Sequence, residues 1–350
     1  MEEAMSLPDS LGIEVGLDEI EYALRKLWEE AGESKTRASL VNLVIYCEEI
    51  GQLEENTRII REVAAEHACR AILILAEPHA SESSSGAWIN AHCHPAGKRE
   101  VCSEQISFHL CGEAARSLPG IVFPHLDSDL PLILWWQATF EGHLREPFWA
   151  WVDRLIFDSS LWKNVAAGVS STRQIADFSG GRMVLGDLNW ARLLGARLAL
   201  ASLFDHAASL EEIAMVEKVA VHHGKGQRMA ALLLGGWLAS RFGWAVKRGA
   251  TQSLEFVRPN GALIHLAPIE SEGPVISRVE FRSGQKRFGI ARPEGSAHYE
   301  LELCDLGVEG AKAIYHAGAD KLSELLLSEL ARGGRHGHYR EAVEAVLEVL

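Results

Sequence analysis

The sequence predicts an α/β (α+β) protein with an N-terminal mixed-sheet α/β domain, a helical middle, and a C-terminal antiparallel sheet with helices. Residues 71–76 are continuously apolar, which is typical of a strand buried on both faces of a layered structure. Residues 244–303 instead contain short alternating strands separated by Gly and Pro, the pattern of an antiparallel meander. We therefore expect a mixed α/β domain over 1–160 and an α+β domain over 161–350.

The N-terminal elements follow from the spacing of apolar residues. Leu17, Ile20, Leu24 and Leu27 recur at helical intervals, so a helix is expected over 18–31 with a capping aspartate at its start. Residues 41–47 fit either a strand or the core of a buried helix, because periodicity alone does not separate these two. A helix over 53–67 is then expected to lead into the strand at 71–76.

Two further strands are joined by a short connection. Residues 87–94 and 101–111 flank Pro95-Ala96-Gly97-Lys98-Arg99, which predicts a hairpin. Downstream, 130–136 and 153–159 are strand-like apolar runs, and each is closed by polar groups that are costly to bury without partners.

The C-terminal half begins with helices. Trp190, Leu193, Leu194 and Leu198 share one face, which predicts a helix that extends to about Ala201, with Asp187 or Asn189 near its cap. A second helix ends at Gly243 and carries the apolar residues Ala230, Leu233, Leu234, Trp237 and Leu238. Two helices close the chain, and the apolar stripe of the last one, over 339–350, is expected to dock on its own domain.

Composition excludes several classes of protein. The formal net charge of −14 argues against a protein that binds nucleic acid without sequence preference, and it disfavours anionic membrane surfaces. No run of 18 or more apolar residues is present, so no membrane span is expected. The start, Met1-Glu2-Glu3-Ala4, lacks the basic region of a signal peptide, so the expected location is cytoplasmic.

Six cysteines are present without a C-x-x-C pair, and in a cytosolic chain they are expected to be reduced. The region of His92, Cys93, His94, Cys102, His109 and Cys111 has the composition of a zinc site. The predicted hairpin, however, places His92 opposite Ser103, and His109 then lies roughly 20 Å further along its strand. No metal site is therefore expected, and a zinc-containing structural protein remains the alternative.

A glycine-containing loop precedes the second helix of the C-terminal half. Gly224, Lys225, Gly226 and Arg228 could bind an anion, because free N–H groups and the helix dipole favour negative charge there. The loop lacks the Gly-Lys-Ser/Thr element of a P-loop. The loop could therefore bind a sugar phosphate, and an alternative function is an enzyme that acts on a sugar phosphate or nucleotide. The other interpretation of the loop is an ordinary connection whose basic tip is solvated.

No catalytic or cofactor-binding residue is expected elsewhere. The sequence contains no G-x-S-x-G, no H-E-x-x-H and no G-x-G-x-x-G after a strand. The aspartates at 127, 129, 153, 158 and 187 could do acid–base work or bind a divalent ion, but turn and capping roles explain Asp158, at a strand end, and Asp187, before a helix. Tryptophans concentrate between 135 and 190, and such residues serve both cores and interface anchors.

An ordered set of segments resembles the OpcA family, the assembly or effector proteins of glucose-6-phosphate dehydrogenase. The matching segments are 36–44, 69–74, 101–106, 128–136, 153–159, 186–193 and 236–241. The resemblance implies a non-catalytic protein that binds glucose-6-phosphate dehydrogenase. Surface members of the segments 135–159 and 190–192 are then the candidate contacts, and the candidates are Trp135, Trp136, Asp153, Arg154, Asp158, Ser159, Trp190 and Arg192.

The resemblance also concerns redox control, which in photosynthetic members is associated with cysteines and thioredoxin. The C-terminal half of this chain contains one cysteine, Cys304, so a disulfide within that half is not expected.

Overall fold

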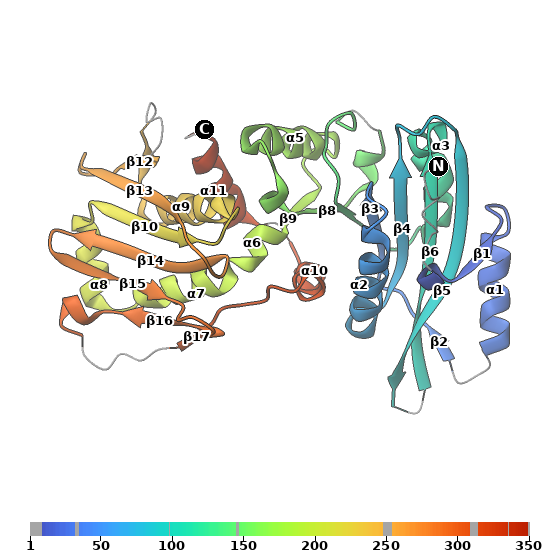
Figure 1. Cartoon of the computed structure of the whole chain (residues 1–350), viewed down its shortest axis with the longest axis horizontal. Helices are drawn as coiled ribbons and strands as arrows, with labels where there is room; N and C mark the ends of the chain where they lie inside the picture. The colour runs from blue at the N-terminus through green and yellow to red at the C-terminus, as the bar shows by residue number, and fades with distance from the viewer. Residues whose placement is uncertain are drawn as a thin grey trace. The chain divides into compact units, whose positions relative to one another are not determined.

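The computed structural model describes residues 9–31, 35–97, 99–144, 147–247, 254–308, 314–334 and 336–348 (Figure 1). The chain forms two compact units. Unit 1 comprises Met1–Phe157, Ser171–Gly186 and Lys321–Gly334, and unit 2 comprises Asp158–Ser170, Asp187–Asp320 and Arg335–Leu350. None of the helices within the described ranges combines the length and the apolar character needed to cross a membrane.

The first sheet has nine strands in the order β1-β5-β6-β4-β3-β7-β8-β9, with β2 paired to β6. Strands β3, β4, β6, β7 and β8 run parallel, and β5 is antiparallel to β6. The strands are β1 (Ile13–Val15), β2 (Lys35–Arg37), β3 (Val41–Cys47), β4 (Cys69–Glu77), β5 (Ser84–Ala96), β6 (Arg99–Cys111), β7 (Leu132–Trp136), β8 (Arg154–Phe157) and β9 (Val184–Asp187).

The predicted elements of this part are present. Residues 41–47 form a strand in which every residue is buried, which settles the choice that periodicity left open. The helix predicted over 18–31 is α1 (Ile20–Ala31), and that predicted over 53–67 is α2 (Gln52–Glu66). Helix α2 lies against the sheet (Figure 1), and its buried side chains include Leu53, Ile59 and Val63. Further helices with residues in unit 1 are α3 (Glu113–Arg116), α4 (Leu118–Val122), α5 (Val165–Phe178) and α10 (Leu322–Ala331).

The hairpin prediction is confirmed by β5 and β6, which pair along their full length. His92 lies opposite Ser103, as predicted. Cys93 lies opposite Cys102, and the two form a disulfide, so the expectation that all cysteines are reduced is wrong for this pair. Directly opposed residues of an antiparallel pair have neighbouring Cβ atoms on one face, which places two thiols within bonding reach.

The second sheet has eight strands in the order β11-β12-β13-β10-β14-β15-β16-β17. It is mixed rather than purely antiparallel as predicted, because β10 pairs parallel with β13 and antiparallel with β14. The sequence did not indicate that β10, which precedes the meander, enters the middle of this sheet. The strands are β10 (Lys218–His223), β11 (Ala245–Val246), β12 (Leu254–Val257), β13 (Leu263–Glu270), β14 (Ile276–Ser283), β15 (Lys286–Ala291), β16 (His298–Glu302) and β17 (Ile314–His316).

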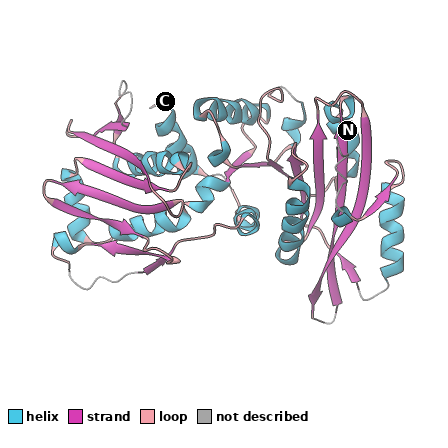
Figure 2. Ribbon diagram, in the orientation of Figure 1, coloured by secondary structure: helices cyan, strands magenta, loops and turns pink. Residues whose placement is uncertain are grey.

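Helices cover one face of the second sheet (Figure 2). Helices α7 (Leu194–Leu203) and α9 (Arg228–Phe242) pack on its strands, and unit 2 also contains α6 (Leu188–Arg192), α8 (Ala207–Glu212) and α11 (Gly337–Leu347). The single helix predicted from Trp190 onward is divided at Leu193 into α6 and α7. Helix α9 ends at Gly243, whose φ of +64° is left-handed, as a C-terminal glycine cap requires.

The last helix, α11, packs on α9 within unit 2, which confirms the predicted docking on its own domain. The approach is close at Gly236, where an added Cβ would lie 2.3 Å from the carbonyl oxygen of Ala342. A glycine is therefore required at this crossing.

Candidate functional site

A buried polar network surrounds the start of α6. Asp187 caps this helix, because its Oδ1 accepts hydrogen bonds from the backbone N–H of Ser159 at 3.0 Å and of Asn189 at 2.9 Å. The Asn189 amide in turn donates to Ser159 Oγ at 3.1 Å. Residues that are far apart in sequence, after β8 and after β9, are thereby joined in one cluster within unit 2.

Arg192 completes the network. Its guanidinium makes a bidentate ion pair with Asp158, with Nη1–Oδ1 at 2.9 Å and Nη2–Oδ2 at 2.6 Å. Both side chains are nearly buried, at 12% and 8% exposure. The structure thus brings together three predicted site residues, Asp158, Ser159 and Arg192, and it adds Asp187 and Asn189, which the sequence had indicated only as helix caps.

The electrostatics of the network are dominated by Asp187. The pKa of this carboxyl is raised to about 7, chiefly by burial and also by the nearby charge of Asp158, while the hydrogen bonds from Ser159 and Asn189 oppose the rise. Ser159 is fully buried, so a substrate in solvent does not reach its hydroxyl. The arrangement holds α6 in place and gives it a carboxyl that titrates near neutral pH.

Trp190 belongs to the same core. It is 2% exposed, the Arg197 guanidinium lies 3.7 Å from its ring centroid, and Tyr339 of α11 packs 5.8 Å away. A guanidinium stacked on a tryptophan face is a stabilising cation–π contact. Trp190 is therefore a core side chain of unit 2 and is not an exposed contact.

Trp135 and Trp136, the other predicted tryptophan contacts, are each 2% exposed. The Trp136 ring stacks on Tyr46 at a centroid distance of 3.9 Å and lies 5.3 Å from Trp149. Its indole N–H donates to the Thr139 carbonyl at 3.1 Å. A partner does not reach these side chains on the folded surface, because strand β7 lies inside the sheet.

The remaining candidates around β8 differ in exposure. Arg154 is buried and donates to Glu329 at 3.3 Å and to the carbonyl of Arg332 at 2.5 Å, which ties β8 to the end of α10. Asp153 is exposed, and one of its carboxylate oxygens accepts the backbone N–H of Leu132 at 2.8 Å. Of the two, only Asp153 lies on the surface.

One exposed aromatic side chain next to these candidates was not singled out from the sequence. Trp151, at the end of a 3-10 helix over Pro147–Trp151, is 65% exposed, whereas Trp149 in the same segment is fully buried. Phe123 lies 5.4 Å from the Trp151 ring. The sequence shows both tryptophans, but a short 3-10 segment has no periodicity that separates the buried ring from the exposed one.

The predicted anion loop is a tight turn between β10 and α9. The backbone N–H of Gln227 donates to the Gly224 carbonyl at 3.0 Å, and Gly226 has a left-handed φ of +73°. Lys225 and Arg228 are exposed. The Gly226 N–H, however, donates to the Glu270 carboxylate at 3.2 Å, so an incoming anion competes with a carboxylate of the protein itself.

The carboxyl ends of β3 and β7 form a separate polar group within unit 1. Strands β4 and β6 lie on one side of β3 and strand β7 lies on the other, so this is the switch point of the sheet, where open α/β sheets bind ligands. Glu48 accepts a hydrogen bond from the Tyr46 hydroxyl at 2.9 Å and lies 3.6 Å from His143 Nε2. The interaction with His143 lowers the pKa of Glu48, and the Tyr46 bond adds to this.

The turn after β3 is acidic and contains one glycine. Its sequence is Cys47-Glu48-Glu49-Ile50-Gly51-Gln52, and two more carboxylates, Glu54 and Glu55, lie in the first turn of α2. Gly51 has ordinary helical angles, with φ −61° and ψ −17°. A cavity of about 10 Å³ in unit 1, lined by residues such as Tyr46, Ile74, Leu134 and Trp136 and by no residue of this turn, has room for about one water molecule.

Comparison with known proteins identifies the family. A family model described as the glucose-6-phosphate dehydrogenase subunit N-terminal domain, OpcA_G6PD_assem, matches residues 60–174. A second, described as the C-terminal domain of that subunit, OpcA_G6PD_C, matches residues 183–343. The two models therefore match consecutive parts of the chain in their expected order.

Among curated proteins, OpcA of Synechocystis sp. (strain PCC 6803) is 24% identical over 320 residues, which is 85% of this chain and 66% of the relative. OpcA of Nostoc punctiforme is 28% identical over 193 residues, which is 53% of this chain and 40% of the relative. In both cases the match spans less than two-thirds of the relative's length.

Among solved structures, the UDP-N-acetylglucosamine 3-dehydrogenase GnnA from Acidithiobacillus ferrooxidans is 10% identical with a TM-score of 0.41, over 90% of this chain and 96% of that chain. A likeness this distant supports no inference about function. The two family models and the curated relatives lead to one conclusion: the chain belongs to the OpcA family.

Proposed function

We propose that this chain is a non-catalytic assembly or effector protein that binds glucose-6-phosphate dehydrogenase in the cytoplasm. The observation that supports the proposal most strongly is the ordered match of both family models, whose descriptions name that enzyme. The curated relatives are named after the OxPP cycle, which agrees with a partner in the oxidative pentose phosphate pathway.

The acidic turn after β3 supports the non-catalytic part of the proposal. A dinucleotide pyrophosphate binds in doubly wound sheets at a glycine-rich turn and a helix N-terminus. Here that position holds Glu48 and Glu49, followed by Glu54 and Glu55 at the start of α2. Two like unit charges 4 Å apart repel by about 4 kcal/mol at the effective dielectric near a protein surface, so a pyrophosphate is disfavoured at this turn.

The effect on the enzyme follows from binding thermodynamics. The chain shifts an equilibrium between states or assemblies of the dehydrogenase only by the difference in its affinity for them, typically ~1–3 kcal/mol of coupling. If the chain changes the affinity of the enzyme for glucose 6-phosphate by some factor, linkage requires that glucose 6-phosphate changes the affinity of the enzyme for the chain by the same factor.

We propose that the surface formed by Asp153, a contact candidate, and the neighbouring Trp151 contacts the partner. Trp151 is 65% exposed and Asp153 is exposed, whereas the predicted contact tryptophans are core side chains. Exposed tryptophans are frequent energetic centres of protein interfaces. The exposed ring also lies in a segment flanked by the strands that carry the family resemblance.

This contact is tested by mass photometry of the chain with its cognate dehydrogenase. Trp151→Ala is expected to weaken the complex by about 30-fold, since truncation of an interface hot spot costs about 2 kcal/mol. The matched control is Tyr22→Ala, because Tyr22 is 64% exposed on α1. Equal affinity of the two variants contradicts the contact, and absence of any complex at micromolar concentrations contradicts the proposed function.

A further inference from the structure

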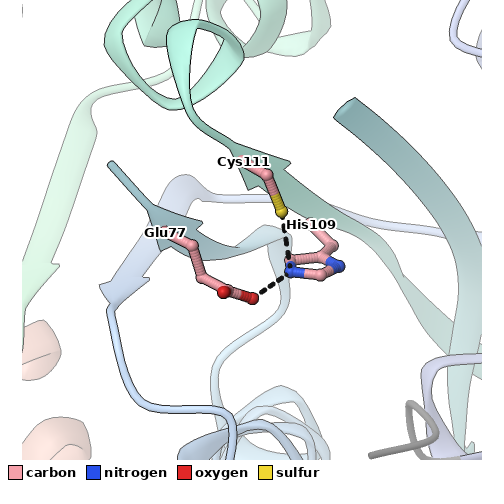
Figure 3. Close-up of side chains that lie close together, drawn as sticks. All are labelled: Glu77, His109 and Cys111. Atoms are coloured by element: carbon pink, nitrogen blue, oxygen red, sulfur yellow. Dashed lines mark hydrogen bonds and ion pairs between the residues drawn. The ribbon is translucent and has the colours of Figure 1, made fainter. Parts of the chain in front are cut away.

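Three side chains with metal-binding chemistry meet at the carboxyl ends of β4 and β6 (Figure 3). Glu77 is the last residue of β4 and pairs in register with Cys111, the last residue of β6. His109 lies two residues before Cys111, so it shares the same face of β6. The parallel register therefore places a carboxylate, an imidazole and a thiol side by side.

The backbone fixes this arrangement. The Glu77 carbonyl accepts a hydrogen bond from the N–H of Gly112 at 2.9 Å, which joins the two strand ends, and one from the N–H of Ala80 at 3.1 Å, which closes the turn after β4. On the other side of β6, the residue paired with His109 is Gly86, which brings no side chain to the cluster. The position of Glu77 beside Cys111 thus depends on several independent backbone contacts.

The side-chain contacts converge on one atom. His109 Nε2 lies 2.6 Å from Glu77 Oε1 and 3.3 Å from Cys111 Sγ, as the dashed lines in Figure 3 show. A catalytic relay uses the two different ring nitrogens of histidine, one towards the thiol and one towards the carboxylate. Contact through a single nitrogen does not provide that relay.

A single proton satisfies only one of these contacts. If Nε2 carries a proton, it donates to the carboxylate but has no lone pair to accept the thiol proton. If Nε2 is unprotonated, it accepts from the thiol but faces the carboxylate with lone pair against lone pair. A cation at the point where the three groups converge interacts favourably with all of them.

We propose that Glu77, His109 and Cys111 form a Zn²⁺ site with one coordination position open to solvent. Their three ligand atoms lie within 4.8 Å of one another. A thiolate, an imidazole and a carboxylate are the ligand types that zinc prefers, and three protein ligands leave the fourth tetrahedral position for water or another ligand.

The exposure of the three side chains agrees with an open site. Glu77 is 44% exposed and His109 is 23% exposed, whereas Cys111 is buried at the base. Two atoms that bind one zinc ion at ~2.0–2.3 Å lie roughly 3.3 to 3.7 Å apart. The Glu77 carboxylate oxygen, which lies 2.6 Å from His109 Nε2, therefore moves away from that nitrogen by less than ~1 Å when zinc binds. Glu77 has the freedom to do so, because it is the most exposed of the three.

This set differs from the zinc cluster considered from the sequence. Cys93 and Cys102 are joined in a disulfide, and His92 lies on the paired strand opposite Ser103, where its ring contacts Gln105 at 2.7 Å. Glu77 was not considered, because it lies 32 residues from His109 and only the parallel pairing of β4 with β6 brings them together.

The test is metal binding by the purified full-length chain, after removal of bound metal with a chelator. Zn²⁺ is titrated against a chromophoric chelator, and Co²⁺ is used as a spectroscopic probe, because thiolate coordination gives a sulfur-to-cobalt charge-transfer band in the near ultraviolet. We expect one equivalent of Zn²⁺, the Co²⁺ band, and weaker binding at lower pH, since the ligands must lose protons to bind.

Variants then assign the ligands. Glu77→Gln, His109→Asn and Cys111→Ser are expected to weaken zinc binding by more than the roughly 10- to 100-fold caused by loss of a supporting residue. Cys111→Ser should also abolish the charge-transfer band. Glu82→Gln is the matched control, because Glu82 is an exposed carboxylate on the connection between β4 and β5.

Less than a tenth of an equivalent of bound zinc, or the same affinity in wild type and Glu77→Gln, overturns the proposal. Glu77 is partly exposed, so its variant keeps the test valid if the buried Cys111→Ser variant does not fold, which circular dichroism detects. The readout does not involve the dehydrogenase, so its outcome is independent of the proposed function.

Discussion

At the scale of single residues, the carboxyl of Asp187 makes the stability of the chain depend on pH. Its pKa rises from 3.8 to about 7 in the folded protein, chiefly because the group is buried. Between these values the folded state holds a proton that the unfolded state has lost. The contribution of Asp187 to the unfolding free energy therefore falls as pH rises from about 4 to about 7, by about 4 kcal/mol in total.

Asp187→Asn removes this titration while keeping an oxygen that accepts the two backbone hydrogen bonds. We expect the fall in unfolding free energy between pH 4 and pH 7 to be shallower in the variant, as measured by urea denaturation at several pH values. Asp129→Asn, at an exposed aspartate, serves as the control. An unchanged slope in Asp187→Asn would show that the carboxyl is not the group responsible.

The ion pair of Arg192 with Asp158 is a second feature at this scale. Arg192→Ala leaves the nearly buried Asp158 beside Asp187 without its counter-charge. We expect the free energy of unfolding to fall by about 3–5 kcal/mol, the usual effect of removing one partner of a buried ion pair. Arg192→Lys is expected to recover part of the lost stability, because a lysine supplies the charge but not the bidentate hydrogen bonds.

The control for this prediction is Arg58→Ala, because Arg58 pairs with Glu55 and Glu62 on the exposed surface of α2. Exposed pairs contribute about 0–1 kcal/mol, so this variant should unfold close to wild type in urea. Similar losses for Arg58→Ala and Arg192→Ala would contradict a special role for the buried network.

At the scale of elements, the crossing of α9 and α11 depends on Gly236. An added Cβ would meet the Ala342 carbonyl at 2.3 Å, and the obstacle is backbone, which does not rotate away. Gly236→Ala should therefore destabilise unit 2 by about 1–3 kcal/mol, the usual cost of overpacking. Thermal unfolding followed by circular dichroism measures the loss.

Gly51→Ala is the matched control for Gly236→Ala, because Gly51 has ordinary helical angles and open space where the Cβ would lie. It should be neutral or slightly stabilising. If Gly236→Ala is as stable as Gly51→Ala, the two helices do not pack as closely as described.

Local patterns predicted most of the individual elements. The hairpin of β5 and β6, the cap at Asp187 and the glycine end of α9 each depend on residues close together in sequence, and each is present. The division of one predicted helix into α6 and α7 was missed, because both halves keep the same apolar face across Leu193.

At the scale of the whole molecule, local sequence patterns did not predict which distant segments pair with one another. The position of β10 between β13 and β14, the return of 171–186 and 321–334 to unit 1, and the approach of Glu77 to His109 all depend on tertiary contacts. Burial of Trp135, Trp136 and Trp190 follows from the same cause. A tryptophan in a motif has the same sequence signature in a core and at an interface, so only the structure identifies Trp151 as exposed.

The proposed effector role is tested most directly by steady-state kinetics of the cognate glucose-6-phosphate dehydrogenase while this chain is titrated into the assay. We expect a saturable change in KM or kcat, with a midpoint equal to the dissociation constant of the complex. Glucose 6-phosphate should change that constant by the same factor as the chain changes the affinity of the enzyme for glucose 6-phosphate, about 5- to 150-fold for typical coupling. Kinetic constants that stay the same when the enzyme is saturated with the chain would contradict the account.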